Sequence, residues 1–164
     1  MDPYRAYKIK SSLLYVFGTL ALGIAVVMIG FMVHILSLRS EYRSFCLEIN
    51  DAVLASPAGS SSISRDGESA PLTDAALNYY DVFLLDEGTL VYNRRAAEPT
   101  DRSITISLPR KTLTFTPLDE GTAVNLRWET PEGVRSYSVR AAYITFEQLS
   151  SYLDTYLRTA PPPG

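Results

Sequence analysis

Apolar residues dominate the chain from Ser11 to Leu38, a run of 28 residues that contains no Asp, Glu, Lys or Arg. A helix rises about 1.5 Å per residue, so roughly 20 such residues cross about 30 Å of hydrocarbon. A single segment can satisfy its backbone hydrogen bonds in lipid only as a helix. The pattern therefore predicts one transmembrane helix over residues 11–38, preceded by a short tail over residues 1–10.

A signal peptide or a buried core helix would account for this run less well. A cleaved signal peptide has an apolar core of about 7–15 residues that is followed closely by a small-x-small cleavage site. Here the run is longer, and the nearest candidate site, over residues 53–55, comes after five charged residues. A buried core helix would need more covering protein than 164 residues readily supply. We therefore expect an uncleaved anchor.

A helical pattern continues beyond the anchor. Apolar residues recur at spacings of four, three, four and four, at Leu38, Tyr42, Phe45, Ile49 and Val53. This spacing predicts an amphipathic helix over residues 39–55, here called the stalk, which ends at Ser56-Pro57. Its apolar face is expected to cover the chain's own sheet. Packing on another chain is the alternative, although a two-stranded coiled coil would need more heptads.

Residues 56–71 are polar and rich in Ser and Gly, which is typical of a flexible linker. Thr73-Asp74 then resembles the start of a short helix that continues to Tyr80. We place the beginning of a separate domain, over residues 72–164, at the end of this linker.

From Val82 onward the apolar residues alternate with polar ones, as in strands that are buried on one face. Turns rich in Gly, Pro, Asp and Glu separate the alternating runs, which cover residues 82–85, 89–92, 103–108, 112–117, 124–129 and 137–143. Such short connections make neighbouring strands antiparallel. The pattern predicts an antiparallel sheet of five or six strands.

The apolar side of this sheet needs a cover, and the chain provides one at its C-terminal end. Thr145 and Gln148 have the spacing of a capping box, and apolar residues follow at helical intervals from Phe146 to Tyr156. Residues 160–164 form a Pro-rich tail. The predicted fold class is therefore α+β, with the sheet covered by the C-terminal helix.

Charge predicts the orientation in the membrane. The tail carries Arg5, Lys8 and Lys10, whereas only Arg39 and Arg43 follow the span closely. Residues 39–164 carry 12 Lys and Arg against 17 Asp and Glu. Since cytoplasmic flanks carry the excess of Lys and Arg, we expect a cytoplasmic N-terminus and an extracytoplasmic domain. The acidic balance argues against a nucleic-acid partner.

The residues that carry most catalytic and metal chemistry are scarce. The single histidine, His34, lies within the predicted span, the single cysteine, Cys46, lies on the stalk, and Lys111 is the only lysine beyond the tail. A Ser-His or Cys-His site outside the membrane would therefore lack a base, and a zinc site would lack ligands. Paired carboxylates occur only at predicted turns, where acidic residues are common. We expect no catalytic residues, no cofactor and no metal.

One feature of the anchor indicates a partner. At 100° per residue, six of the seven Gly, Ser, Thr and His residues between Ser12 and Ser37 fall within a stripe about 60° wide, and only Gly18 lies elsewhere. We name the helix contact face after its central members, Thr19, Gly23, Gly30 and His34. Small residues let helices approach closely in lipid, and polar residues hydrogen-bond across the contact. The stripe predicts association with another membrane protein or with a second copy of this chain.

These patterns favour a single-pass protein of a bacterial cell envelope, since a lone cysteine allows no intrachain disulfide and no Asn-x-Ser/Thr site is present. Its outer domain would bind a partner or ligand without catalysis, as an accessory of a membrane complex. The layout also resembles that of pilins, in which a long helix leads into an antiparallel sheet. The pilin processing signature is absent, however: no basic leader ends at Gly18, and no acidic residue lies in the span. An anchored cell-envelope hydrolase is the third alternative.

Overall fold

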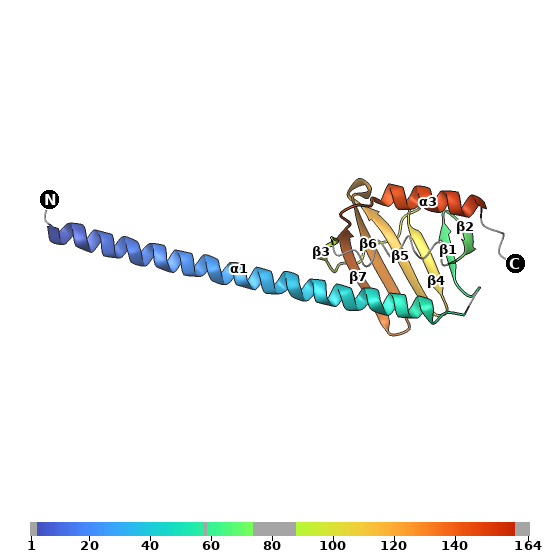
Figure 1. Cartoon of the computed structure of the whole chain (residues 1–164), viewed down its shortest axis with the longest axis horizontal. Coiled ribbons are helices and arrows are strands. Elements are labelled where there is room, and N and C mark those ends of the chain that lie inside the picture. The colour runs from blue at the N-terminus through green and yellow to red at the C-terminus, as the bar shows by residue number, and fades with distance from the viewer. Residues whose placement is uncertain (1–2, 58, 74–87, 160–164) are drawn as a thin grey trace. The chain divides into compact units, whose positions relative to one another are not determined.

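The computed structural model describes residues 3–57, 59–73 and 88–159, and only the backbone of residues 3–13. Contacts divide the chain into two compact units, residues 1–37 and 38–164. The elements, of which the α-helices and strands are labelled in Figure 1, are α1 (Pro3–Leu54), β1 (Ser62–Arg65), β2 (Glu68–Pro71), β3 (Leu90–Asn93), β4 (Ile104–Leu108), β5 (Lys111–Leu118), the 3₁₀ turn η1 (Asp119–Gly121), β6 (Ala123–Thr130), β7 (Gly133–Arg140) and α3 (Phe146–Thr159).

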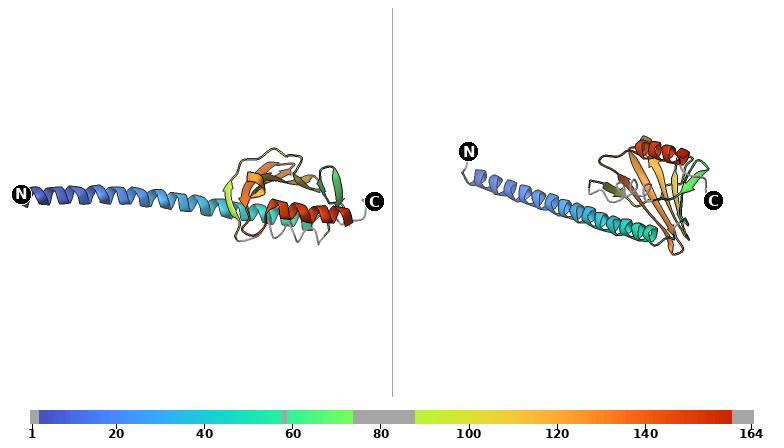
Figure 2. Two further views of the ribbon diagram at one scale, coloured as in Figure 1. Left: turned by 90° about the horizontal axis from the view of Figure 1, so that it is seen from above. Right: turned by 45° about the vertical axis from the view of Figure 1, so that its right-hand side comes forward.

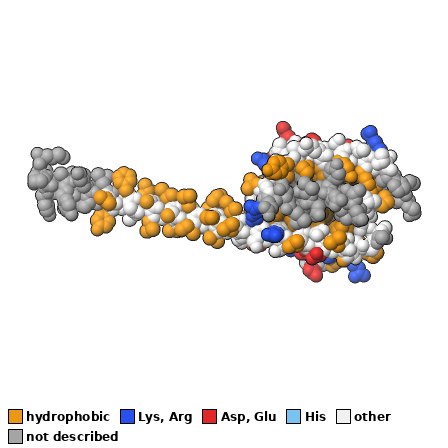
Figure 3. All heavy atoms as spheres, viewed as in Figure 1, with side chains coloured by type: hydrophobic (Ala, Val, Ile, Leu, Met, Phe, Trp, Pro, Cys, Tyr) orange, Lys and Arg blue, Asp and Glu red, His pale blue; other side chains and the backbone are white. Residues whose placement is uncertain are grey.

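The first unit consists of the N-terminal part of α1. Its large apolar side chains from Leu14 onward are exposed; Phe17, for example, stands away from the helix and keeps 64% of its surface exposed. Figure 3 shows these apolar side chains along the helix. This segment is long and apolar enough to cross a membrane, and no part of the described chain covers it. The structure is therefore compatible with the predicted anchor.

The second unit contains a seven-stranded, fully antiparallel sheet in the order β2-β1-β4-β5-β6-β7-β3. The α+β class is confirmed, whereas the predicted count of five or six strands is too low. Strands β4 to β7 follow one another through short turns, as the alternation predicts. Strand β3 joins the sheet beside β7 at its far edge.

The expectation of a flexible linker over residues 56–71 is wrong. This segment contains the hairpin of β1 and β2, and β1 pairs in turn with β4. The turn is Asp66-Gly67, whose φ angles of 50° and 82° are the positive values that a tight two-residue hairpin turn requires. Ile63 and Ala70 lie opposite each other and are buried. The segment resembles a linker in sequence because its remaining strand residues are mostly small or polar.

One face of the sheet is apolar and forms the core with two helices. Cross-strand neighbours such as Ile106, Leu113 and Trp128 are almost fully buried there. Both α3 and residues 38–54 of α1 lie on this face (Figure 2). Phe45 of the stalk packs against Tyr137 of β7, with ring centroids 4.7 Å apart. The stalk therefore covers the chain's own sheet, as expected.

The opposite face of the sheet is rich in Ser and Thr and is partly covered by the segment that follows β3. Asn125 of β6, which is fully buried, holds this segment in place. Its Nδ2 donates to the backbone oxygen of Arg95 at 2.9 Å, and its Oδ1 accepts from the backbone nitrogen of Ala97 at 3.0 Å. Ser136 and Ser138 on β7 complete the hydrogen bonding of the amide.

The C-terminal helix begins with the predicted capping box. The backbone nitrogen of Thr145 donates to the side chain of Gln148 at 2.9 Å, and the nitrogen of Gln148 donates to Thr145 Oγ1 at 3.3 Å. Tyr143, which was expected on the core face of the last strand, is 83% exposed because β7 already ends at Arg140. The expected helix over residues 73–80 and strand over residues 82–85 fall almost wholly outside the described residues.

Candidate functional site

The helix contact face lies on α1 within the first unit. Thr19, Gly23, Gly30 and His34 are all exposed, and a methyl group added to either of the two glycines would meet no atom within 4 Å. These positions are therefore open, with room for the close approach of another helix. The structure supplies no occupant, so the association remains a prediction.

The hydroxyl group of Thr19 needs no hydrogen-bond partner on another helix. Its Oγ1 bonds to the backbone oxygens of Tyr15 and Val16, both at 3.0 Å, within its own helix. Such local bonding satisfies the hydroxyl in an apolar medium. On this face, we therefore assign Thr19 and the glycines a packing role, and His34 is the side chain that would require a polar partner in lipid.

A second cluster joins the stalk to the sheet through Glu48, and sequence patterns did not predict it. Glu48 Oε1 accepts a hydrogen bond of 3.0 Å from the indole nitrogen of Trp128, and Oε2 contacts Arg135. The hydrogen bond from Arg135 holds the pKa of this carboxyl below its usual value, against the opposing effect of burial. Glu48 thus forms a charged link between α1 and the sheet.

Lys111 lies beside this cluster. Its Nζ is 5.7 Å from the centre of the Trp128 ring, within the range of a cation–π contact. A shallow groove on the same surface is lined by Ser44, Leu47, Glu48, Asp51, Ala52, Ala55 and Lys111. The groove is open, and Glu48, its carboxylate of lowered pKa, is paired with Arg135.

Two other carboxylates of the described chain, which come from predicted turns, contact arginines. Asp119 contacts Arg140 at 3.5 Å, and Glu129 contacts Arg127 at 2.7 Å. Among the described residues, no three His, Cys, Asp or Glu side chains are grouped as metal ligands. The pair Asp86-Glu87 lies outside the described residues.

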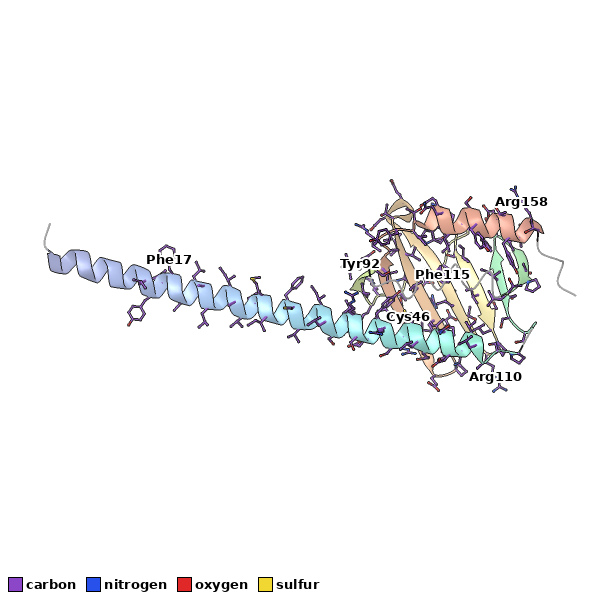
Figure 4. The ribbon with its side chains drawn as sticks, in the orientation of Figure 1. Phe17, Cys46, Tyr92, Arg110, Phe115 and Arg158 are labelled. Atoms are coloured by element: carbon purple, nitrogen blue, oxygen red, sulfur yellow. The ribbon has the colours of Figure 1, made fainter. Side chains whose placement is uncertain are left out.

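Exposed tyrosines suit ligand contact, because each offers a flat apolar face with a polar tip, and Tyr79, Tyr80 and Tyr92 are the candidates outside the predicted core. Tyr92 on the edge strand β3 is 45% exposed and lies at one end of the domain (Figure 4). Its pKa is raised, mainly because it is partly desolvated. Tyr79 and Tyr80 are outside the described residues, so the structure assigns only Tyr92 a position on the surface.

Comparison with known proteins gives no match: the chain fits no protein family, and no curated protein or solved structure is significantly similar to it.

Proposed function

We propose that this chain is a single-pass protein of a bacterial cell envelope, anchored by residues 11–38 with its N-terminus in the cytoplasm. Its extracytoplasmic α+β domain binds a partner and has no catalytic role. The anchor associates through the helix contact face with another membrane protein or a second copy, so that the chain acts as an accessory of a membrane complex.

One observation supports this proposal most strongly: α1 is uncovered over the residues that the membrane would contain and covered immediately afterwards. Val33 and Leu36 are 61% and 56% exposed, whereas Leu38, Tyr42 and Phe45 are at most 5% exposed. An uncovered apolar helix of this length is costly in water and favourable in lipid. The change at Leu38 coincides with the predicted end of the span.

The open glycines of the contact face, Gly23 and Gly30, provide the packing surface for a membrane partner.

Crosslinking in membranes tests the association. In G23L/G30L, leucine side chains would fill the contact face, and we expect crosslinking of the chain to itself or to a partner to be lost. The matched control A21L/A25L adds bulk to the opposite side of the same helix. Unchanged crosslinking in G23L/G30L, or equal loss in the control, would reject the proposed face. Extraction of the wild type by alkaline carbonate would reject the anchor itself.

A pilin-like filament subunit is the second candidate, and the packing of the stalk on an antiparallel sheet favours it. This alternative requires a processed N-terminus, because pilins lose their leader before assembly. N-terminal sequencing of the mature protein separates the two: an intact tail with Lys8 and Lys10 supports the accessory protein, and cleavage at Gly18 supports the filament subunit.

A further inference from the structure

Four arginines gather at the first turns of the stalk, although they come from two distant parts of the sequence. Arg39 and Arg43 are exposed on the helix directly after the apolar run, and Arg94 and Arg95 are exposed in the segment that follows β3. All four belong to the second unit, residues 38–164. The fold thus adds two cations to the pair that the sequence places after the span.

Two contacts hold the distant pair in place. Arg94 Nη2 lies 2.9 Å from Glu41 Oε2, which joins this segment to the first turn of the stalk. The backbone oxygen of Arg95 accepts the hydrogen bond from the buried Asn125 described above. Arg94 nevertheless keeps 49% of its side chain exposed. The stalk and the sheet therefore hold this segment in place, while Arg94 and Arg95 themselves remain exposed.

The arginines lie on two sides of the helix. With about 100° per residue, Arg39 and Arg43 fall on one flank of the buried face, and Glu41, with its partner Arg94, falls on the other. Residues 39–43 cover only about 6 Å along the helix axis. Arg39, Arg43 and Arg94, which contacts Glu41, therefore lie at one level, immediately beyond the last residue of the apolar run. Arg95 is the next residue after Arg94, and we call the four arginines the collar.

The collar differs in charge from the rest of the domain. Residues 39–164 carry 12 basic and 17 acidic residues, and the collar contains four of the basic residues but only one of the acidic ones, Glu41. The remainder has eight basic residues against sixteen acidic ones. An acidic domain repels an anionic membrane surface, and the collar reverses that sign at the level where the helix would leave the lipid.

We propose that this collar binds the phosphate groups of anionic lipids and so sets the domain against the membrane surface. The planar guanidinium group binds phosphate oxygens through paired hydrogen bonds, and arginine keeps its charge at any physiological pH. The binding rests on the proposed membrane anchor. It goes beyond that anchor because it requires a particular lipid charge rather than hydrocarbon alone.

The test uses the full chain in phosphatidylcholine nanodiscs with a trace of spin-labelled phosphatidylglycerol or phosphatidylcholine. Electron paramagnetic resonance then gives the relative association of the two lipids at low salt. We expect a preference for phosphatidylglycerol that falls about fivefold for each arginine removed in R94Q/R95Q. The basic tail is the same in every variant, so the difference between variants reports the collar.

R110Q/R158Q is the matched control, because it removes the same charge from the same domain. Both arginines are exposed and lie at the other end of the domain from Tyr92 (Figure 4). R43Q/R95Q is a second test variant that leaves the contact between Glu41 and Arg94 intact.

The proposal is overturned if the wild type shows no preference, if both collar variants keep it, or if the control loses it equally. A chain that resists carbonate extraction but shows no lipid preference refutes only the collar. A chain that carbonate extracts refutes the anchor.

Discussion

At the scale of single residues, buried polar contacts fix parts of the chain that apolar patterning leaves undetermined. Glu48 connects the stalk to Trp128, and Asn125 connects residues 95–97 to the sheet. Each contact satisfies a donor or acceptor that would otherwise be buried without a partner. Loss of one member therefore costs more than the hydrogen bond itself, since the remaining group stays desolvated.

Replacement of Glu48 should destabilise the domain. In E48A the indole nitrogen of the fully buried Trp128 loses its acceptor, and we expect a loss of about 1–3 kcal/mol in the free energy of unfolding. Trp128 is the chain's only tryptophan, so its fluorescence during urea unfolding in detergent is a direct measurement. Glu132, exposed at the β6–β7 turn, provides the control E132A. Equal stability of E48A and E132A would contradict the proposed role of this contact.

The contribution of Glu48 should also depend on pH. Its pKa is lowered in the folded chain, so the charged form is favoured by folding. That stabilisation is fully present above the unfolded pKa of about 4.3 and disappears as the pH falls through the lower folded value. We expect E48Q to be less stable than the wild type at pH 6, with a difference that shrinks below about pH 4. If the stability difference between E48Q and the wild type grew on acidification, the expected direction of the pH dependence would be wrong.

Asn125 should control the accessibility of the arginine-containing segment. N125A removes four hydrogen bonds from a fully buried site, and we expect a loss of about 2–4 kcal/mol in the free energy of unfolding. Trypsin should then cleave after Arg94 and Arg95 faster than in the wild type. N93A, which removes only a local bond to the nitrogen of Arg95, is the control. Cleavage at the wild-type rate in N125A would argue against this anchoring.

At the scale of elements, the stalk combines a buried face and an exposed face within the same turns. Phe45 is fully buried between aromatic neighbours, whereas Leu47, two residues later, is 47% exposed. F45A should therefore cost about 3–5 kcal/mol, and L47A less than about 0.5 kcal/mol. Cys46 provides the measurement, because burial raises its pKa to about 12 and suppresses its reactivity. Labelling of the Cys46 thiol should be faster in F45A than in the wild type and unchanged in L47A. Equal labelling rates in F45A and L47A would contradict the packing of Phe45 in the core.

The elements also show what can be predicted from sequence and what cannot. The stalk was predictable because large apolar residues mark one face at helical spacing, and α3 because Thr145 and Gln148 mark its start. The β1–β2 hairpin was missed because Ile63 is its only large apolar residue, although Asp66-Gly67 is a turn signal. The contact of Glu48 with Trp128 joins residues 80 positions apart, and local periodicity carries no information on such pairs.

At the scale of the whole molecule, the orientation of the chain in the membrane is set by the charges that flank the span before the domain folds. Orientation responds to Lys and Arg within about 15–20 residues of the span. Arg94 and Arg95 lie far beyond that distance in sequence and approach the stalk only when the domain folds. The decisive comparison is therefore Arg5, Lys8 and Lys10 on one side against Arg39 and Arg43 on the other, which favours a cytoplasmic N-terminus.

The lysines of the tail should therefore control the membrane topology. Protease added to bacterial spheroplasts should digest the domain of the wild type, whereas inverted membrane vesicles should protect it. K8Q/K10Q leaves one cation before the span against two after it, so part of the population should insert in the opposite orientation and resist digestion in spheroplasts. R94Q/R95Q should insert like the wild type, because these arginines act only after folding. Reversal by R94Q/R95Q, or protection of the wild-type domain in spheroplasts, would contradict this order of events.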